Sequence, residues 1–414
     1  MKIRIITWLA AAGLLTFPLS AFNISVESAT GSDMPADVQV DLNAVPYKEA
    51  QTVFTSAGNE VHKSLRIPCL VNANGLIVAA CEGRYSHGDQ ASNDIVVSVS
   101  KDAGQTWTTP VIAAKSDDGA TFNNPCMIYD AQARKIVLMF QRYAKGVKER
   151  DGLPLNLKDP RALRTFVCFS EDGEVWTKPQ EVTENTRHKD CATHCSGPNP
   201  GVQITKGAAK GRLVVVFNEA EKFGNWHVTA AFSDDHGKTW KVGAKSDAGH
   251  GINEVSSVET ERGGVLVVAR KHGGPGGNVK RVVYSKNGGK SWGPVTYHKD
   301  LPCVGCQNGL TRYSFASEKE KGSKGRILFS GPAGPGRSNG VIKMSYDDGK
   351  TWPVEKSVGP GGFAYSTMCP LKPGYVGLLF ESDGGNTIKF VPIAIKWLTD
   401  GKDNGLFGSG KKVK

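Results

Sequence analysis

Short runs of apolar and β-branched residues, each ended by a polar turn, dominate the hydrophobic pattern of this chain. Three of them read DIVVSVS at 94–100, HVTAAFS at 227–233 and GVIKMS at 340–345. Such runs place one face of an extended segment in a core, so we predict a β-strand in each. Helical periodicity is scarce, and the chain carries 49 glycines and 21 prolines. The pattern therefore predicts an all-β fold.

A polar turn of nearly constant composition recurs after these runs. Its copies are SKDAGQTW at 100–107, SEDGEVW at 170–176, SDDHGKTW at 233–240, SKNGGKSW at 285–292 and SYDDGKTW at 345–352. The serines at 100, 170, 233, 285 and 345 are 70, 63, 52 and 60 residues apart, an interval that suits a propeller blade with its loops. Asp, Ser and Thr can bind nearby backbone amides, Gly accepts a positive φ, and Trp can pack over the blade. We interpret the copies as structural turns, not as catalytic residues.

The length of the repeating region limits the number of blades. Roughly 340 residues between positions 61 and 400, at about 60 per blade, fit six blades better than five or seven. We therefore predict a six-bladed β-propeller with four-stranded antiparallel blades, forming one domain over residues 46–400. The least regular segment, 142–164, is dense in charge and contains two prolines, and we predict a long surface insertion there. Residues 401–414 are expected to form a basic C-terminal tail.

The amino terminus has the pattern of a secretory signal peptide over residues 1–21. Lys2 and Arg4 precede an apolar run that ends in small residues up to Ala21. We expect cleavage after Ala21, a leader segment at 22–45, and a mature protein that is secreted or periplasmic. No later segment is apolar enough to span a bilayer and no lipid-modifiable cysteine follows the signal, so we expect no stable membrane insertion.

Net charge and cysteine content limit the classes of partner and of metal site that the sequence supports. The formal net charge of +11 suits an anionic partner, but the basic runs are short and lack interleaved aromatics, so we expect no binding of nucleic acid. Nine cysteines include Cys303 and Cys306 in a CxxC and a CATHC stretch at 191–195, spacings that a zinc site can use. The two groups lie far apart in sequence, so local disulfides or buried thiols are the favoured interpretation. We expect no metal.

Motifs outside the turns carry a family resemblance. They are LRIPCLV at 65–71, GRYSHGDQASNDIVV at 83–97, NEVSSVETERGGVLVVAR at 253–270, FSGPAGPGRSNG at 329–340, AYSTM at 364–368 and GLLFES at 377–382. Together with the repeated turns they resemble the exo-α-sialidases, or neuraminidases, of the six-bladed propeller type with Asp-box repeats. The motifs come in the family's order and span nearly the whole chain after the signal segment.

The resemblance assigns three arginines to substrate binding: Arg66, Arg270 and Arg337. Sialic acid carries a carboxylate on its anomeric carbon, so the enzyme must hold a fixed anion beside a developing positive centre. The planar guanidinium group donates two parallel hydrogen bonds to a carboxylate and stays charged at any working pH. Each arginine taken alone would be read as a surface or loop-bracing residue. Their appearance in three matching contexts favours function.

A tyrosine nucleophile is implied at Tyr365, with Glu254 as its base. A carboxylate nucleophile would be repelled by the substrate's own carboxylate, whereas a phenol is neutral. The phenol has a pKa near 10 and needs a base to remove its proton. Sialidases are an exception to the general rule of carboxylate nucleophiles in glycosidases. Glu259 is the rival base, and it is expected on the opposite face of the strand.

The remaining roles fall on Asp89, Arg84 and Glu381. Asp89 matches the acid/base position and lies in a loop, as suits a group that approaches the glycosidic oxygen. Asp94 is the rival acid, but it opens a strand and is expected to brace it. By the resemblance, Arg84 is an additional arginine near the substrate, and Glu381 pairs with Arg66 to orient its guanidinium group.

The resemblance thus implies a retaining exo-α-sialidase that hydrolyses terminal sialic acids through a covalent sialyl-tyrosine intermediate. We expect a monomer acting on sialylated glycans, glycoproteins or glycolipids, with no metal or organic cofactor. A trans-sialidase, including an intramolecular one, would share every residue named. A non-catalytic sialoglycan-binding propeller would keep the arginines and lose the tyrosine, its base and the acid.

Overall fold

Strands account for most of the secondary structure in a computed structural model that describes residues 40–317 and 323–406. Within those residues the chain has 25 β-strands, two short α-helices and two 3-10 helices, which confirms the all-β class. The expected signal peptide at 1–21, most of the leader and residues 407–414 of the tail lie outside the described residues. None of the helices in the described ranges is long and apolar enough to cross a membrane.

Hydrogen bonds group the strands into five sheets. The largest contains β2 (Ser64–Ala73), β3 (Leu76–Arg84), β4 (Asn93–Ser100), β5 (Val111–Ala114), β6 (Thr121–Asp130), β7 (Lys135–Tyr143), β8 (Arg164–Ser170) and β9 (Gln180–Glu181). The next contains β10 (Thr193–Ser196), β11 (Val202–Gln203), β12 (Leu213–Ala220), β13 (His227–Ser233) and β14 (Lys241–Val242). A third contains β15 (Ile252–Glu259), β16 (Val265–Lys271), β17 (Val279–Ser285) and β18 (Thr296–Pro302).

Two four-stranded sheets complete the described fold. One contains β19 (Gly309–Ser314), β20 (Arg326–Pro332), β21 (Gly340–Ser345) and β22 (Val354–Ser357). The other contains β23 (Ser366–Pro370), β24 (Tyr375–Glu381), β25 (Thr387–Ala394) and, from the opposite end of the chain, β1 (Gln51–Thr55). The short helices are α1 (Pro46–Glu49), α2 (Ile395–Leu398), η1 (Glu149–Asp151) and η2 (Thr183–Asn185).

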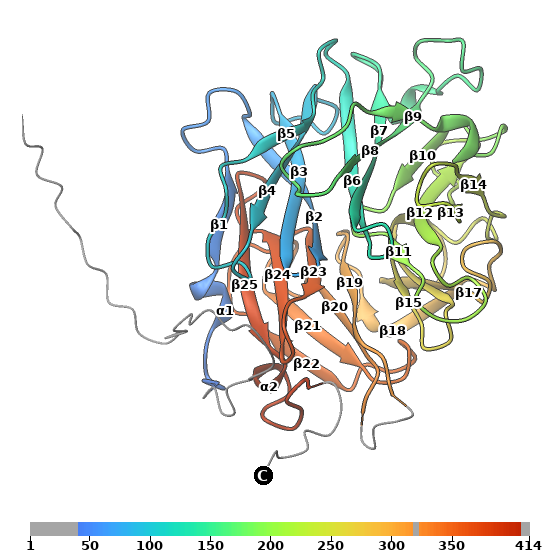
Figure 1. The fold of residues 1–414 in the computed structure, drawn as a ribbon. Coiled ribbons are helices and arrows are strands. Elements are labelled where there is room, and N and C mark those ends of the chain that lie inside the picture. The colour runs from blue at the N-terminus through green and yellow to red at the C-terminus, as the bar shows by residue number, and fades with distance from the viewer. Residues whose placement is uncertain (1–39, 318–322, 407–414) are drawn as a thin grey trace, which may run out of the picture. The chain divides into compact units, whose positions relative to one another are not determined.

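The sheets are arranged as a β-propeller. The first strands β2, β6, β10, β15, β19 and β23 contact one another in succession, and β23 contacts β2 again. In Figure 1 these strands follow one another in chain order, from β2 in blue to β23 in red. The largest sheet has two antiparallel halves, β2–β5 and β6–β9, joined by one parallel pairing of Asn93 with Thr121. Because that pairing merges two sheets, the described residues form five hydrogen-bonded sheets where the sequence predicted six.

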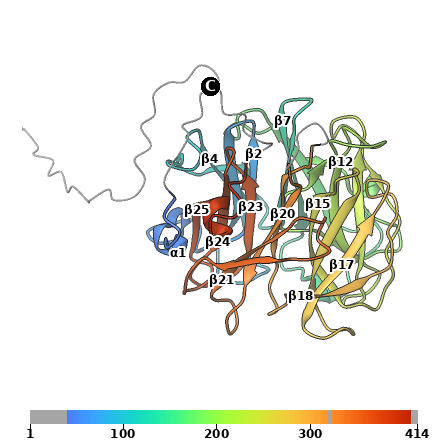
Figure 2. The same ribbon diagram turned by 90° about the horizontal axis from the view of Figure 1, so that it is seen from below.

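The sheet that closes the propeller is built from both ends of the described chain. Strand β1 pairs antiparallel with β25, so that Gln51 lies opposite Phe390 and Thr55 opposite Thr387. Figure 1 shows this blue strand beside the red strands, and Figure 2 shows α1 next to β25 from below. Pairing with β1 covers the edge of β25, and β1 becomes the outer strand of this sheet.

The repeated turns connect the third and fourth strands and hold themselves together through serine and aspartate, with asparagine in place of aspartate in the copy at 285–292. In the first copy, Ser100 Oγ accepts a hydrogen bond from Gly104 N at 2.7 Å, and Asp102 Oδ1 accepts one from Thr106 N at 2.8 Å. Gly104 has φ +92°, and an added Cβ would lie 2.1 Å from the ring of Phe390. The turns lie outside the pocket described below, as their structural interpretation requires.

The segment 142–164 is the long surface insertion that its charge suggested, and most of its residues are at least partly exposed. It joins β7 to β8, and Leu153 and Leu163 within it are buried against Tyr143, Ala192 and Cys195. Burial of these leucines anchors the segment, and its middle reaches the pocket. The charge pattern therefore predicted the surface position of the segment but not its path to the pocket, because a few apolar residues decide where such a segment packs.

All nine cysteines lie in the described part of the chain, each as a buried free thiol, in agreement with one of the two favoured interpretations.

A buried ion pair fixes the segment after α2. Arg326 Nε and Nη2 each donate to the carboxylate of Asp403 at 2.8 Å, and both side chains are buried. Tyr346 Oη donates to the same carboxylate at 2.9 Å.

Candidate active site

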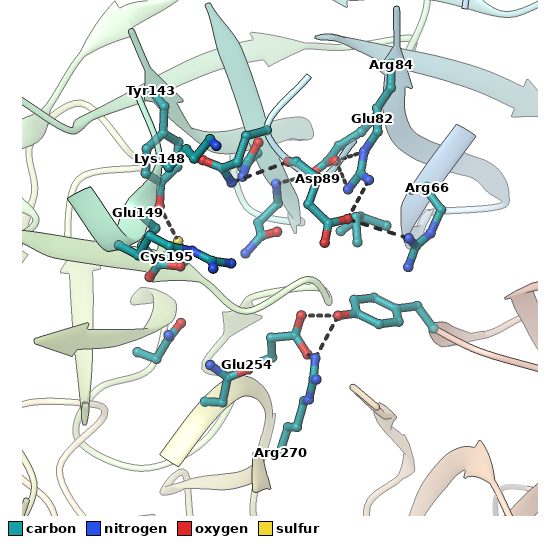
Figure 3. A pocket seen from close by; sticks show the side chains of 18 of the residues that line it. Arg66, Glu82, Arg84, Asp89, Tyr143, Lys148, Glu149, Cys195, Glu254 and Arg270 are labelled. Carbon is teal, nitrogen blue, oxygen red and sulfur yellow. Dashed lines mark hydrogen bonds and ion pairs between the residues drawn. The ribbon is translucent and has the colours of Figure 1, made fainter. Parts of the chain in front are cut away.

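A pocket of about 290 Å³ opens where the first strand of several sheets begins and the second strand ends. In an antiparallel sheet these two points are neighbours, so residues far apart in sequence meet at one edge. Arg66 of β2, Arg84 of β3, Glu254 of β15 and Arg270 of β16 come together in this way. Figure 3 shows Arg66, Arg84 and Asp89 on one side of the pocket and Glu254 with Arg270 on another.

Shifts in the strand pairing lie next to several pocket residues and change the direction of their side chains. The pairing of β2 with β3 shifts between Arg66 and Cys69, that of β6 with β7 between Asn123 and Cys126, and that of β15 with β16 between Ile252 and Val255. A shift of this kind breaks the alternation of side chains and turns one of them to a new direction. In β2, Ile67 also takes φ +62°, which is rare for a β-branched residue and costs free energy. The strain lies next to Arg66, where it sets the direction of the chain.

Tyr365, Glu254 and Arg270 form a hydrogen-bonded group. The Tyr365 hydroxyl donates to Glu254 Oε1, and Arg270 Nη1 donates to Glu254 Oε2 at 2.8 Å and to Tyr365 Oη at 3.1 Å. Burial and the neighbouring Glu254 carboxylate raise the pKa of Tyr365 well above its usual value, while Arg270 opposes that rise. The phenol is therefore neutral at rest and has an acceptor for its proton in direct contact.

Glu259 faces away from this group, although it belongs to the same strand as Glu254. Its carboxylate accepts from Thr205 N at 2.9 Å, from Thr205 Oγ1 at 2.8 Å and from Lys206 N at 2.8 Å. These bonds tie β15 to the loop after β11. Glu259 thus has a bracing position, and only Glu254 of the two lies beside the tyrosine.

Three arginines surround the tyrosine ring. The guanidinium carbons of Arg66 and Arg337 lie 5.3 Å and 5.1 Å from the centre of the Tyr365 ring, and Arg270 contacts its hydroxyl. Arg337 Nη2 donates to the backbone carbonyl of Gly305 at 3.2 Å. The pocket therefore has a concentrated positive charge above the phenol, which suits a carboxylate ligand.

Glu381 holds Arg66 from below. Its Oε1 accepts from Arg66 Nε at 2.7 Å and from the backbone N–H of Ile67 at 2.8 Å. Burial opposes the charge of Arg66, but Glu381 outweighs that cost and raises the pKa of the guanidinium group. Since only Nε is taken by Glu381, the outer nitrogens of Arg66 remain directed toward the pocket.

Asp89 lies at the mouth of the pocket, in the loop between β3 and β4. Its side chain is 82 % exposed, and its carboxylate accepts a hydrogen bond from Arg84 Nη1 at 2.8 Å and lies 3.9 Å from Arg66 Nη1. Burial opposes ionisation, but the bond from Arg84 and the charges of Arg84, Arg66 and Arg337 lower the pKa of Asp89. Asp94, the rival, is buried in β4 and braces the loop, accepting from His62 and Tyr85.

Glu82 is a pocket residue that the sequence analysis missed. It is fully buried, its carboxylate binds Arg84 Nη2 at 2.7 Å, and it accepts from the backbone N–H of Asn124 at 2.9 Å. Burial raises the pKa of Glu82 despite the bond with Arg84. The signal was available in the sequence, because residues two apart on a strand share one face. Glu82 and Arg84 are such a pair in β3.

The far wall of the pocket was not predicted at all. Glu149, from the segment between β7 and β8, accepts from Thr193 Oγ1 at 2.8 Å, and burial raises the pKa of its carboxyl group. Tyr143 Oη lies 3.0 Å from Cys195 Sγ, and Asn218 Oδ1 is buried with no hydrogen-bond partner among the described residues. Figure 3 shows Tyr143, Glu149 and Cys195 together across from Arg66. This wall offers polar groups to the part of a ligand that extends beyond the arginines.

Within the described residues, the CxxC and CATHC motifs do not come together in one cluster of possible metal ligands. In the CATHC stretch, His194 Nε2 contacts Thr165 Oγ1 and Cys195 Sγ contacts Tyr143. Among the described residues, His188, Cys191 and Glu219 bring possible ligand atoms within 4.8 Å of one another. Within that group His188 Nδ1 is already paired with Glu219 at 2.8 Å, and none of the three lines the pocket.

Comparison with known proteins gives a consistent result. Residues 75–378 match the family described as "BNR repeat-like domain". A sialidase of Micromonospora viridifaciens is 31 % identical over 350 residues, covering 82 % of this chain and 53 % of its own, and a sialidase of Bacteroides fragilis is 25 % identical over 407 residues, covering 88 % and 72 %. This chain therefore spans about half the length of the Micromonospora protein.

Solved structures show the same fold. A Hadza microbial sialidase superimposes with a TM-score of 0.73 at 24 % identity, covering 84 % of this chain and 69 % of its own. A leech intramolecular trans-sialidase, solved with 2,7-anhydro-Neu5Ac, gives 0.72 at 20 % identity, covering 85 % and 71 %. At these identities the likeness concerns the fold.

Proposed function

The chain belongs to the sialidase family with BNR repeat-like domains, and from this we propose that it is a retaining exo-α-sialidase. It would release terminal sialic acids from sialylated glycans, glycoproteins or glycolipids. The observation that carries the proposal is the hydrogen-bonded group of Tyr365, Glu254 and Arg270 beneath two further arginines. A binding protein would need the arginines alone.

Substrate binding is assigned to Arg66, Arg270 and Arg337. The carboxylate of the sugar bridges their guanidinium groups, which converge on the Tyr365 ring. Glu381 occupies one edge of Arg66 and so leaves its other edge for the ligand. With the carboxylate fixed in this way, the anomeric carbon lies over the tyrosine hydroxyl.

The first chemical step is the attack of Tyr365 Oη on the anomeric carbon. Glu254 takes the phenol proton as the new C–O bond forms, and Asp89 in its protonated form donates a proton to the leaving oxygen as the glycosidic bond breaks. The product is a covalent sialyl-tyrosine. In the second step Asp89 deprotonates a water molecule, which attacks the anomeric carbon. The phenolate leaves and recovers its proton from Glu254.

Environment suits each residue to its role. Tyr365 is buried and neutral, so it is not repelled by the substrate carboxylate, and its base is already in contact. Asp89 is exposed on a loop, where it can follow the leaving group. An incoming carboxylate offsets the charge of the arginines around Asp89. That raises the pKa of the acid when it is needed in its protonated form.

We also propose a blade count for the propeller and a cellular location for the protein. Counting the two halves of the largest sheet as separate blades gives six, with the first strands as the inner ring, and the closed cycle of strand contacts supports this count. We place the propeller at residues 46–400 and assign residues 1–21 as a signal peptide, which makes the protein an exported one.

The test is product analysis with a matched variant. The purified chain is incubated with a fluorogenic α-sialoside, and an early NMR spectrum is taken of the released sugar. Free sialic acid in the α-anomeric form is expected, and Tyr365→Phe should lose nearly all turnover while it still binds a non-hydrolysable analogue. An anhydro or transferred sugar would make the protein a trans-sialidase. A Tyr365→Phe variant with wild-type rates would overturn the proposed nucleophile.

A further inference from the structure

The loop between β18 and β19 connects a pair of cysteines to the candidate active site. It carries Cys303 and Cys306 in the CxxC arrangement, with Gly305 between them at φ +71°. Cys306 packs against Ile67, Ala364 and Tyr365. Gly305 O accepts the hydrogen bond from Arg337. A change in this turn would therefore reach both the tyrosine and one of the arginines.

The two cysteines have different surroundings. Cys303 Sγ accepts a hydrogen bond from the backbone N–H of Lys271 at 3.4 Å, and Lys271 directly follows Arg270. Burial opposes ionisation of Cys303, but the charge of Lys280 and backbone N–H groups of the turn lower the pKa of its thiol. Burial raises the pKa of Cys306 to about 12. Cys303 is thus the nucleophilic member of the pair and Cys306 the resolving member.

Lys280 links the charge of this turn to its backbone. Its side chain is buried, and Nζ donates to the carbonyl of Cys306 at 2.6 Å. Burial lowers the pKa of Lys280, while the adjacent cysteines oppose that effect. The ammonium group is best retained when Cys303 is a thiolate, because a buried charge needs an opposite charge nearby. Loss of the thiolate would weaken the hold of Lys280 on the turn.

We propose that Cys303 and Cys306 form a reversible dithiol–disulfide site that lowers activity when oxidised. The oxidant is a small organic disulfide. The Cys303 thiolate attacks one of its sulfurs and releases one thiolate. Cys306 then loses its proton and attacks the Cys303 sulfur, which expels the second thiolate. Two cysteine thiols are thereby oxidised by two electrons, and the organic disulfide is reduced to two thiols that take up the two protons.

Oxidation acts on substrate binding in this scheme. Closing the disulfide ties the Cys306 sulfur, which packs against Tyr365, to Cys303, and a disulfide sulfur can no longer offer Lys280 a thiolate partner. The Gly305 carbonyl moves with the turn, so Arg337 loses its anchor. Loss of one hydrogen bond to a charged group corresponds to about a tenfold rise in KM for a sialoside. This activity effect rests on the proposed function, whereas formation of the disulfide does not.

The experiment uses the full chain, reduced with dithiothreitol and equilibrated with reduced and oxidised glutathione at set ratios. Acid quenching, alkylation of free thiols and peptide mass spectrometry give the fraction of Cys303–Cys306 disulfide, and KM is measured on the same samples. We expect the disulfide to rise with oxidised glutathione, KM to rise in parallel and dithiothreitol to restore both. Cys303→Ser/Cys306→Ser should keep one KM throughout. Cys168→Ser, a buried thiol of β8, should respond as wild type.

Three results would overturn the proposal: thiols at 303 and 306 that persist at the most oxidising ratio, a disulfide that dithiothreitol cannot reduce in the folded protein, or equal KM values for the two forms. If the double variant does not fold, Cys306→Ser replaces it and should accumulate glutathione on Cys303. Labelling elsewhere would contradict the assignment of the nucleophile. A reduced chain that cleaves no sialoside would refute the proposed function, and the mass measurement would still decide the fate of the cysteine pair.

Discussion

Replacing Glu254 with glutamine tests the proton transfer on which the proposed chemistry depends. The substitution keeps the size of the side chain and an oxygen that can accept the Tyr365 hydroxyl, but it removes the negative charge and the ability to take a proton. Arg270 also loses a charged partner, so the electrostatic support of the phenol changes together with its base.

The size of the effect follows from the ionisation of the phenol. With a pKa near 10, only about one tyrosine in a thousand is ionised at pH 7. Burial raises the pKa of Tyr365 further, so the fraction of phenolate in this pocket is smaller still. A well-placed general base typically contributes about 10² to 10⁴ in rate. We therefore expect Glu254→Gln to lower kcat at pH 7 by a factor on the order of 10³.

The assay is release of a fluorescent aglycone from an α-sialoside over a range of pH. Relative to wild type, the rate of Glu254→Gln should rise about tenfold per pH unit, because solvent must now remove the proton and the phenolate fraction grows at that rate, while the dependence on protonated Asp89 is common to both enzymes. Glu259→Gln is the matched control, since Glu259 lies in the same strand and binds Thr205 and Lys206. It should retain wild-type kcat, with thermal melts to show that both variants fold. If Glu254→Gln stays within about threefold of wild type, or if Glu259→Gln loses more activity, the assignment of the base is refuted.

Three further outcomes follow from the site and its support. Arg337→Lys should raise KM about tenfold with little change in kcat, because an ammonium group cannot donate a parallel pair of bonds to a carboxylate; steady-state kinetics with an unchanged KM would contradict this. The arginine-lowered pKa of Asp89 makes kcat/KM fall as pH rises through that low value. Bound substrate offsets the arginine charge, so the fall of kcat should occur at a higher pH than the fall of kcat/KM. If kcat and kcat/KM fall over the same pH range, Asp89 is not the acid. Asp403→Asn leaves Arg326 buried without a counter-charge and should cost about 3 kcal/mol of unfolding free energy, measured by urea denaturation. Because Arg326 lowers the pKa of Asp403, the wild-type advantage should be present above about pH 4 and disappear as the pH falls through the lowered value, and a difference that persists in acid would contradict it.

Much of the fold could be read from local patterns. The runs that alternate or are rich in β-branched residues became strands, for example β13 (His227–Ser233) and β21 (Gly340–Ser345). Pairing over long distances could not be read in the same way. Nothing local in residues 51–55 indicates that they pair with β25, because that choice depends on which edge remains open once the other strands are placed.

Some residues of the candidate site could be identified from the sequence and others could not. Arg270 and Tyr365 were named from the sequence through the family resemblance, and both line the pocket. Glu149 was not, because its segment looks like a solvated loop and only the buried leucines that follow it show where it lies. The direction of Arg66 also depends on a register shift and on the positive φ of Ile67, neither of which leaves a mark in the order of residues.

The pairing of β1 with β25 has a consequence for how the protein is made. The first strand of the described chain to be synthesised is the last to find its partner, since more than three hundred residues separate Gln51 from Phe390. During translation β1 must wait, and the partly built ring keeps an open edge that invites aggregation until β25 emerges. The completed ring then behaves as one cooperative unit. Backbone amides between β1 and β25 should therefore exchange with solvent only as fast as the whole propeller opens.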